Sequence, residues 1–351
     1  MYPEWIRSMP KVELHRHLEG SIRPATILDM FRRNLGMYLD TSLEELLPRM
    51  QITGSERSLV DFLAKFEFFM PCIKSRADIT RITREVIEDC AAEGTVHAEL
   101  RFSPAFIQGL TGLSLVEAVE AVLDGAREVP AGMSVSFILG TPQPRGVEVA
   151  WDTVKLARDY LSSGVRGVDI SDDTRIRSLE EYQAPMEWAR SEGLGVTIHA
   201  GEAEGPESVR TAVERLGATR LGHGVRAVEC DEVLELAVAR GVVFEVCPTS
   251  NIHTRVAESY ENHPMVQLLA AGAKVTLNTD DPGISGISLG HEYQVAISHW
   301  GLGPDELRQM NLTAARAAFV DDARKAELAA VVAAWRPDDG SAGGAAGGPR
   351  S

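Results

Sequence analysis

The sequence predicts an α/β fold, a (β/α)8 TIM barrel, and three observations support this prediction. First, short apolar runs alternate with amphipathic segments about eight times along the chain, which is the pattern of repeated βα units. Second, the 351 residues are enough for a barrel of roughly 250 residues plus insertions. Third, 44% of the residues are hydrophobic and 25% are charged, a composition typical of soluble globular proteins.

The eight apolar runs are short, and we expect each of them to form one strand of the barrel. In chain order, the predicted strands span residues 11–17, 95–103, 134–140, 165–171, 195–201, 219–224, 241–248 and 273–281. Among the segments between them, those at residues 179–193, 206–218 and 230–241 are amphipathic and end at or near a glycine, which commonly terminates a helix.

The longest gap between predicted strands, residues 18–94, follows the first strand. It contains about three predicted helices, and we interpret it as a helical insertion over one end of the barrel. Two further helices, near 304–318 and 322–335, are expected to close the fold. Residues 1–335 are therefore predicted to form a single domain. The remaining residues, 336–351, are glycine-rich with almost nothing apolar, so we expect a disordered tail.

The charge and the apolar pattern argue against several kinds of partner. The chain has 35 basic and 51 acidic residues, a formal net charge of −16, whereas nucleic acids and anionic membranes bind basic surfaces. No apolar run reaches the roughly 18 residues of a membrane span, and the first ten residues do not resemble a signal peptide. The four cysteines form no Cys-x-x-Cys pair and are interpreted as reduced packing residues. We expect a cytoplasmic protein without a nucleic-acid or membrane partner; the sequence indicates nothing about its oligomeric state.

Side chains that bind metals gather where the predicted strands end. Enzymes built on this barrel place their working residues at the carboxyl ends of the strands. The residues at these ends are His15 and His17 on the first strand, His199 on the fifth, His223 on the sixth, and Asp280 and Asp281 on the eighth. Alternate residues of one strand face the same side, so the first two imidazoles can approach one ion. This convergence predicts a catalytic metal site.

Three imidazoles and one carboxylate suit zinc, and iron or cobalt could use the same ligands. A bound dication lowers the pKa of water from 15.7 toward about 7. His223 is the candidate base or hydrogen-bond partner of that water. Glu202, three residues beyond His199, is the candidate acid, provided that its carboxyl group is shielded from water. Of the adjacent Asp280 and Asp281, one would bind the metal and the next would face the substrate.

These residues resemble the adenosine deaminase family of zinc hydrolases. The matching motifs, in the family's order, are PKVELHRHLEGS (10–21), HAGE (199–202), GHG (222–224) and LNTDDP (277–282), with weaker matches at LRFSP (100–104) and GVDIS (167–171). The resemblance implies an enzyme that hydrolyses the 6-amino group of an adenine nucleoside, adenosine by default, to a 6-oxo group and releases ammonia.

The resemblance also implies a role for each matched residue. One zinc ion per chain would be held by His15, His17, His199 and Asp280. Glu202 would protonate N1 of the purine, His223 would orient or deprotonate the water that attacks C6, and Asp281 would hydrogen-bond N7. The implied substrate contacts are His17, Glu19, Asp172, Gly201 and Asp281.

The chain departs from the family pattern on the side away from the metal. Residues 169–174 read DISDDT where the family usually reads DLAGDE, so Asp172 replaces a glycine and adds a carboxylate near the site. The family's Arg-His pair after the third strand is missing from residues 140–146, and Glu19 stands where an aspartate near the ribose is common. Adenine and 6-amino-6-deoxyfutalosine, a menaquinone precursor, are therefore alternative substrates.

Two other function classes are alternatives to a deaminase. A metal-dependent hydrolase of cyclic amides or esters would be favoured by a lysine at the end of the fourth strand, and no lysine stands there. A catalytically inert nucleoside-binding protein would be indicated by the loss of the acid or of a ligand, and none is lost. A deaminase of the cytidine type is disfavoured because its Pro-Cys-x-x-Cys signature is missing.

One further pattern predicts structure rather than catalysis. His97, Glu99 and Arg101 alternate on one face of the second predicted strand. We expect them to form a structural hydrogen-bond network, because charged groups inside a fold need partners.

Overall fold

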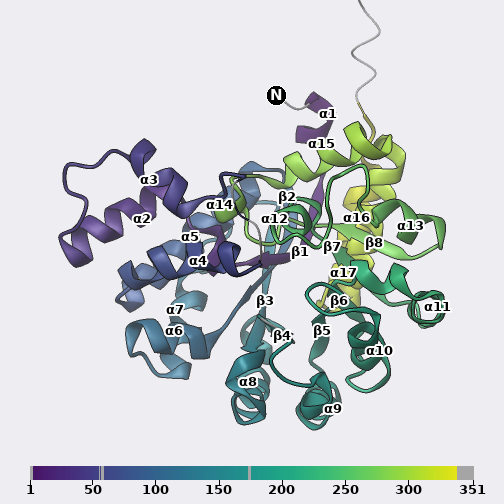
Figure 1. Cartoon of the computed structure of the whole chain (residues 1–351), viewed down its shortest axis with the longest axis horizontal. Helices are drawn as coiled ribbons and strands as arrows, with labels where there is room; N and C mark the ends of the chain where they lie inside the picture. Colours follow the sequence, from purple (N-terminus) through teal and green to yellow (C-terminus); the bar gives the residue numbers. More distant parts are fainter. Residues whose placement is uncertain (1–2, 55, 57–58, 173–174, 338–351) are drawn as a thin grey trace, which may run out of the picture.

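The computed structural model describes residues 3–54, 56, 59–172 and 175–337, and its centre is an eight-stranded barrel (Figure 1). The strands are β1 (Lys11–His17), β2 (Thr95–Phe102), β3 (Ser134–Pro142), β4 (Val165–Ser171), β5 (Gly195–Ala200), β6 (Arg220–His223), β7 (Val243–Val246) and β8 (Lys274–Leu277). Each strand pairs in parallel with the next along the chain, which confirms the predicted fold class. Most of the predicted tail, from residue 338 on, lies outside the described residues.

A short bridge between the end of β1 and the segment after β8 closes the barrel. Arg16 pairs in parallel with Asp280. The backbone N–H of His17 donates to the carbonyl of Asp280 at 2.8 Å, and the N–H of Asp280 donates to the carbonyl of His15 at 2.9 Å. The closure thus places the end of β1 directly beside the segment after β8, although more than 260 residues separate the two in the chain.

The last three strands are shorter than predicted, and at two of them the backbone becomes left-handed at the strand's last residue or a few residues beyond it. β6 stops at His223, whose φ is +62°, and β8 stops before Asp280, whose φ is +61°. Residues other than glycine rarely adopt this left-handed conformation, and it interrupts a strand ladder. Just beyond β8, a side chain rather than the backbone bonds to β1, since Oδ1 of Asn278 accepts the N–H of Leu14 at 3.0 Å.

Helices surround the barrel, and most of them connect successive strands. The ring of connecting helices includes α5 (Arg76–Ala92), α7 (Leu115–Gly125), α8 (Val147–Asp159), α9 (Gln183–Ser191), α10 (Pro206–Glu214), α11 (Asp231–Ala239) and the shorter α13 (Met265–Ala270). The short helices α6 (Pro104–Thr111), α12 (Pro248–His253) and α14 (Pro282–Ser285) begin near the carboxyl ends of β2, β7 and β8. The chain starts with α1 (Glu4–Ser8), and after β8 it continues through α15 (Leu289–Trp300), α16 (Pro304–Ala317) and α17 (Asp322–Ala334). The two predicted closing helices are therefore confirmed.

The segment between β1 and β2 contains more helix than predicted. Besides short 3-10 and π-helical turns, it holds α2 (Pro24–Met30), α3 (Leu43–Met50), α4 (Leu59–Phe69) and α5. Because α5 packs against β2 and α7, it belongs to the ring of barrel helices. The insertion therefore consists of α2–α4, which project to the left of the barrel in Figure 1. An inserted helix and a ring helix share one amphipathic period, so the sequence pattern alone did not separate them.

Apolar side chains fill the space between the strands and the ring helices. A second, smaller cluster centred on Val12 and Leu14 packs α16 and α17 against β1. The four cysteines form no disulfide, as predicted, and Cys230 is the only one that is not fully buried. The cytoplasmic location inferred in part from them stays a prediction.

In the part of the chain that the structure describes, no single helix is long and apolar enough to cross a membrane. One pair, α6 with α7, reaches that length and composition together but is bent by 102°.

Candidate active site

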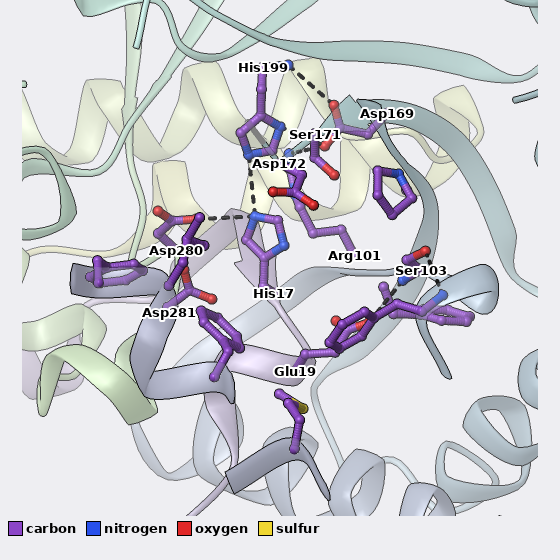
Figure 2. A pocket seen from close by; sticks show the side chains of 18 of the residues that line it. His17, Glu19, Arg101, Ser103, Asp169, Ser171, Asp172, His199, Asp280 and Asp281 are labelled. Carbon is purple, nitrogen blue, oxygen red and sulfur yellow. Dashed lines mark hydrogen bonds and ion pairs between the residues drawn. The ribbon is translucent and has the colours of Figure 1, made fainter. Parts of the chain in front are cut away.

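The predicted metal-binding side chains meet at the carboxyl end of the barrel. Ligand atoms of His15, His199, His223 and Asp280 all lie within 4.8 Å of one another, and all four residues are buried. Nε2 of His17 lies 3.3 Å from Nε2 of His199 and 3.2 Å from Oδ1 of Asp280 (Figure 2). The structure thus brings five predicted side chains around one point, one more than a four-coordinate metal requires.

The atoms of this cluster are arranged as a cation would require. Nδ1 of His15 donates to Oε2 of Glu245 at 2.9 Å, which leaves a lone pair on Nε2 of the neutral imidazole. That Nε2 lies 3.1 Å from Oδ1 of Asp280, and both atoms are buried without a hydrogen-bond partner among the described residues. Buried polar atoms in native proteins are usually satisfied, and two facing lone pairs are satisfied by an ion between them. Nitrogen and oxygen donors in this number fit a divalent metal such as zinc.

The charges around the cluster also favour a cation. Burial disfavours a charged imidazole at His17, but the carboxylates of Asp281 and Asp280 outweigh burial and raise the pKa of His17 to about 9. Burial raises the pKa of Asp281 well above its usual value, and the neighbouring Asp280 raises it further. For Asp280, contacts with His15 and His17 overcome burial and hold the pKa well below its usual value. The two adjacent carboxyl groups therefore favour different protonation states.

Two buried carboxylates that the sequence analysis did not identify orient two of the histidines. Glu245 on β7 accepts from Nδ1 of His15 at 2.9 Å, and Asp169 on β4 lies 2.9 Å from Nδ1 of His199. Arg101 joins both carboxylates, with Nη1 2.8 Å from Asp169 and Nη2 2.7 Å from Glu245. Each imidazole therefore carries its proton on Nδ1 and turns Nε2 toward the cluster, an arrangement typical of metal-binding histidines.

The predicted network on β2 is present and extends across the barrel interior. Arg220 contacts Glu99 at 2.6 Å and Glu245 at 2.7 Å, and Nδ1 of His97 lies 2.7 Å from the hydroxyl of Ser134. The sequence does contain one signal that Glu245 is important. A carboxylate in the middle of the apolar run VFEV would be buried, and a buried carboxylate needs charged or hydrogen-bonding partners.

We expect Glu245→Gln to weaken metal binding about 10–100-fold, the usual effect of losing a partner of a metal-bound histidine. The amide is a weaker acceptor for Nδ1–H of His15. Arg101 retains its ion pair with Asp169, and Arg220 retains its ion pair with Glu99. Competition with a chelator would measure the affinity. Glu99→Gln is the matched control, because it lies in the same network but contacts no histidine of the cluster. Equal metal affinity in the two variants would contradict the orienting role of Glu245.

A sharp turn after β5 brings Glu202 to the cluster. Gly201 has a φ of +63°, and a Cβ there would lie 2.6 Å from a methyl carbon of Val209, so both the conformation and the space require glycine. Its N–H donates to the hydroxyl of Ser208 at 2.8 Å. Oε2 of Glu202 lies 3.5 Å from Nε2 of His223, and its side chain is 12% exposed. Gly201 itself does not line the neighbouring cavity, so its observed contribution is the turn.

A cavity of about 540 Å³ opens beside the cluster, within the usual size range of small-molecule sites. The predicted residues that border it are His17, Glu19, Asp172, His199, Glu202, Asp280 and Asp281. The opposite wall is largely apolar and comes from α4, β2 and α6, with Phe62, Phe66, Phe102 and Phe106 among its side chains. Glu19 accepts the N–H of Ser103 at 2.9 Å, and burial raises its pKa. The cavity thus combines an apolar wall with several polar groups.

Backbone strain and close packing concentrate at this site. Three of the five described non-glycine residues with positive φ are His223, Asp280 and Asp172, the last at +78°. Such conformations persist where the surrounding structure imposes them, and they cluster at active sites. A Cβ at Gly20 would lie 1.6 Å from Oδ1 of Asp281, and one at Gly222 would lie 2.9 Å from Cε1 of His15. The glycines of the LEG and GHG motifs thus make room for functional side chains.

Comparison with known proteins shows which sequence family this chain resembles. Residues 10–335 match the sequence profile of a family described as adenosine deaminase. A Shewanella loihica protein described as adenosine deaminase is 36% identical to this chain, over 93% of this chain and 99% of its own length. A Salmonella newport protein of the same description is also 36% identical, over 93% of this chain and 98% of its own.

Solved structures show the same fold. An adenine deaminase from Arthrobacter aurescens superposes with a TM-score of 0.82 at 26% identity, covering 93% of this chain and 98% of its own. An N6-methyl-AMP deaminase from Arabidopsis thaliana gives 0.82 at 31% identity, covering 94% and 98%. An amidohydrolase from Burkholderia ambifaria, solved with bound Zn, gives 0.85 at 27% identity, covering 94% and 91%.

Proposed function

Since this chain belongs to the adenosine deaminase family and catalyses the hydrolytic deamination of adenine nucleosides, we propose that adenosine is its substrate and zinc its metal. In this reaction water adds to C6 of the purine and the 6-amino group leaves as ammonia, giving the 6-oxo product. The observation that carries the proposal is that Glu202, His17, His199 and two differently protonated carboxyl groups border one cavity. A group of metal-binding side chains, a candidate acid and an apolar wall that can hold a flat ring therefore lie around the same cavity.

We assign one zinc ion per chain to His15, His17, His199 and Asp280. When bound, the ion would lower the pKa of water from 15.7 toward about 7 and so make hydroxide available near neutral pH. The relative from Burkholderia ambifaria, which holds Zn, supports this choice of metal. His17 is the most exposed of the four ligands, and it also borders the cavity, so it would contact the substrate as well.

The residues around the purine would divide the remaining work. Glu202 would donate a proton to N1, which makes C6 a better target for water. Asp281, in its protonated form, would donate a hydrogen bond to N7, which is an acceptor. His223, 3.5 Å from the carboxylate of Glu202, would stand beside the attacking water.

The outer part of the cavity favours a nucleoside over a nucleotide. Arg101 is the only arginine or lysine among the described residues that line the cavity, and it is buried and paired with Asp169 and Glu245. Two lining carboxylates, Glu67 and Asp172, are exposed and therefore lie toward the mouth. A 5′-phosphate would meet like charges there, which disfavours binding.

A substrate panel with ammonia release as the readout tests this function. It holds adenosine, 2′-deoxyadenosine, adenine, AMP and 6-amino-6-deoxyfutalosine, with cytidine as a negative control. We expect adenosine to exceed AMP in kcat/KM by at least about tenfold at low salt, and by less at high salt because salt screens exposed charges. Analogues with a tetrahedral hydroxylated carbon at the C6 position should bind at least about 10²-fold more tightly than the substrate. Turnover of a cyclic amide or ester, but of no 6-aminopurine, would replace the deaminase with a general metal-dependent hydrolase.

We also propose that residues 1–335 act as a single domain. The first and last parts of the described chain pack together, since α1 contacts α15, and α16 contacts both β1 and β8. The purine nucleoside and water are the partners that this proposal requires.

A further inference from the structure

His223 differs from two neighbouring histidines in the group that its Nδ1 faces. Nδ1 of His15 and Nδ1 of His199 face the carboxylates of Glu245 and Asp169, which can only accept hydrogen bonds when ionised. Nδ1 of His223 instead lies 3.1 Å from Nδ2 of an amide side chain, Asn251 on α12. An amide NH2 group can only donate, so the hydrogen-bond pattern at His223 is reversed.

The direction of this contact is fixed by a backbone N–H farther along the chain. The N–H of Met265 lies 3.1 Å from Nδ1 of His263, and since a backbone N–H can only donate, this Nδ1 accepts. Burial lowers the pKa of His263 to about 4, so the ring is neutral and carries its proton on Nε2. Nε2 of His263 then donates to Oδ1 of Asn251 at 3.2 Å. With its oxygen engaged there, Asn251 must turn its NH2 group toward His223.

The same logic places the proton of His223. Because Nδ1 accepts from Asn251, the neutral ring carries its proton on Nε2, the atom that points into the cluster. Nε2 lies 3.5 Å from Glu202 and 3.8 Å from Oδ2 of Asp280. A nitrogen that carries a proton has no lone pair for a metal, whereas His15 and His199 present such a lone pair.

We propose that Asn251 and His263 are positioning residues that hold His223 as a hydrogen-bond donor to the attacking water and outside the ligand set of the metal. The inference rests on the deaminase chemistry proposed above and decides between two roles for His223, orienting the water or deprotonating it, in favour of orienting. The arrangement is well supported, because Asn251 and His263 are buried and the His263 ring packs against Trp300 with centroids 5.4 Å apart.

Nitrogen-15 NMR of histidine side chains in the metal-loaded, substrate-free protein tests the tautomer directly. We expect the proton of His223 on Nε2, and the protons of His15 and His199 on Nδ1. A proton on Nδ1 of His223 would overturn the inference. Because no substrate is present, this result does not depend on which nucleoside the enzyme prefers.

Asn251→Asp reverses the contact with almost no change in shape. A carboxylate only accepts, so His223 would place its proton on Nδ1 and turn a bare Nε2 toward the water. We expect kcat for adenosine to fall about 10–100-fold, as for other residues that orient an active-site group, with little change in KM and one metal per chain. Asn262→Asp, an exposed change of equal charge in the same connection, is the control and should behave like the parent.

Two substitutions at His263 separate positioning from packing. His263→Gln keeps an N–H donor for Asn251 and should retain most of kcat and the Nε2–H tautomer of His223. His263→Leu removes the donor and should lower kcat as Asn251→Asp does. Equal losses in the Gln and Leu variants, or parent kcat in both His263→Leu and Asn251→Asp, would overturn the positioning role. Absence of nucleoside turnover in the parent would instead overturn the proposed function and leave the NMR result standing.

Discussion

Replacing His15 with alanine is expected to remove the metal and the activity together. Among the described residues its Nε2 has no hydrogen-bond partner and faces Asp280 at 3.1 Å, and its Nδ1 is committed to Glu245, so His15 presents a lone pair to the metal. Loss of the ion returns water to its ordinary pKa, and we expect kcat/KM to fall on the order of 10³-fold or more. Metal analysis of protein purified without chelators should give about one equivalent in the parent and almost none in the variant.

Parallel substitutions test which histidines are ligands. His17→Ala should also lose the metal, whereas His223→Ala should keep it and lose only activity. His299→Ala is the control, because this histidine pairs with Glu261 at the surface and should leave metal content and rate unchanged. Metal retained in His17→Ala but lost in His223→Ala would show that the ligand assignment is wrong. Two equivalents in the parent, or full activity without metal, would contradict a mononuclear site.

Glu202→Gln is expected to keep the metal and to lose about 10²–10⁴-fold in kcat, the usual cost of removing a positioned acid. Glutamine nearly matches the shape of glutamate, so the turn at Gly201 and the cavity should be preserved. It cannot deliver a proton to N1, and without that proton C6 is a poor target for water. The side chain borders the cavity and is mostly shielded from solvent, as an acid in this role requires.

The measurement compares kcat, KM and metal content of the variant with those of the parent. Glu207→Gln is a matched control, since this glutamate stands on the exposed side of α10 only five residues away and pairs with Arg210. A Glu202→Gln enzyme that turns adenosine over at nearly the parent rate would remove the acid assignment. Loss of metal in the variant would indicate that Glu202 supports the cluster rather than the purine.

The sequence by itself determined the fold class and most of the residues around the cluster. Eight apolar runs specify eight strands because each buried strand needs its own continuous apolar segment. In a barrel of parallel strands all carboxyl ends meet at one rim, so the positions of His15, His199 and Asp280 at strand ends were enough to predict that they converge. These signals are local in the sequence, and the rule that all strand ends of a parallel barrel share one rim converts them into positions in space.

Only the tertiary structure decided which side chains touch and in which protonation state. Glu245 meets His15 across 230 residues of sequence, and Asn251 meets His223 through a contact that depends on how α12 packs. From the residue pattern alone either Asp280 or Asp281 could bind the metal, and only the family resemblance assigned the metal to Asp280. In the structure the two side chains favour different protonation states, because two adjacent buried carboxyl groups cannot both be charged at low cost. Hydrogen-bond direction, burial and the mutual influence of charges arise from packing between distant segments, and no local pattern in the sequence encodes them.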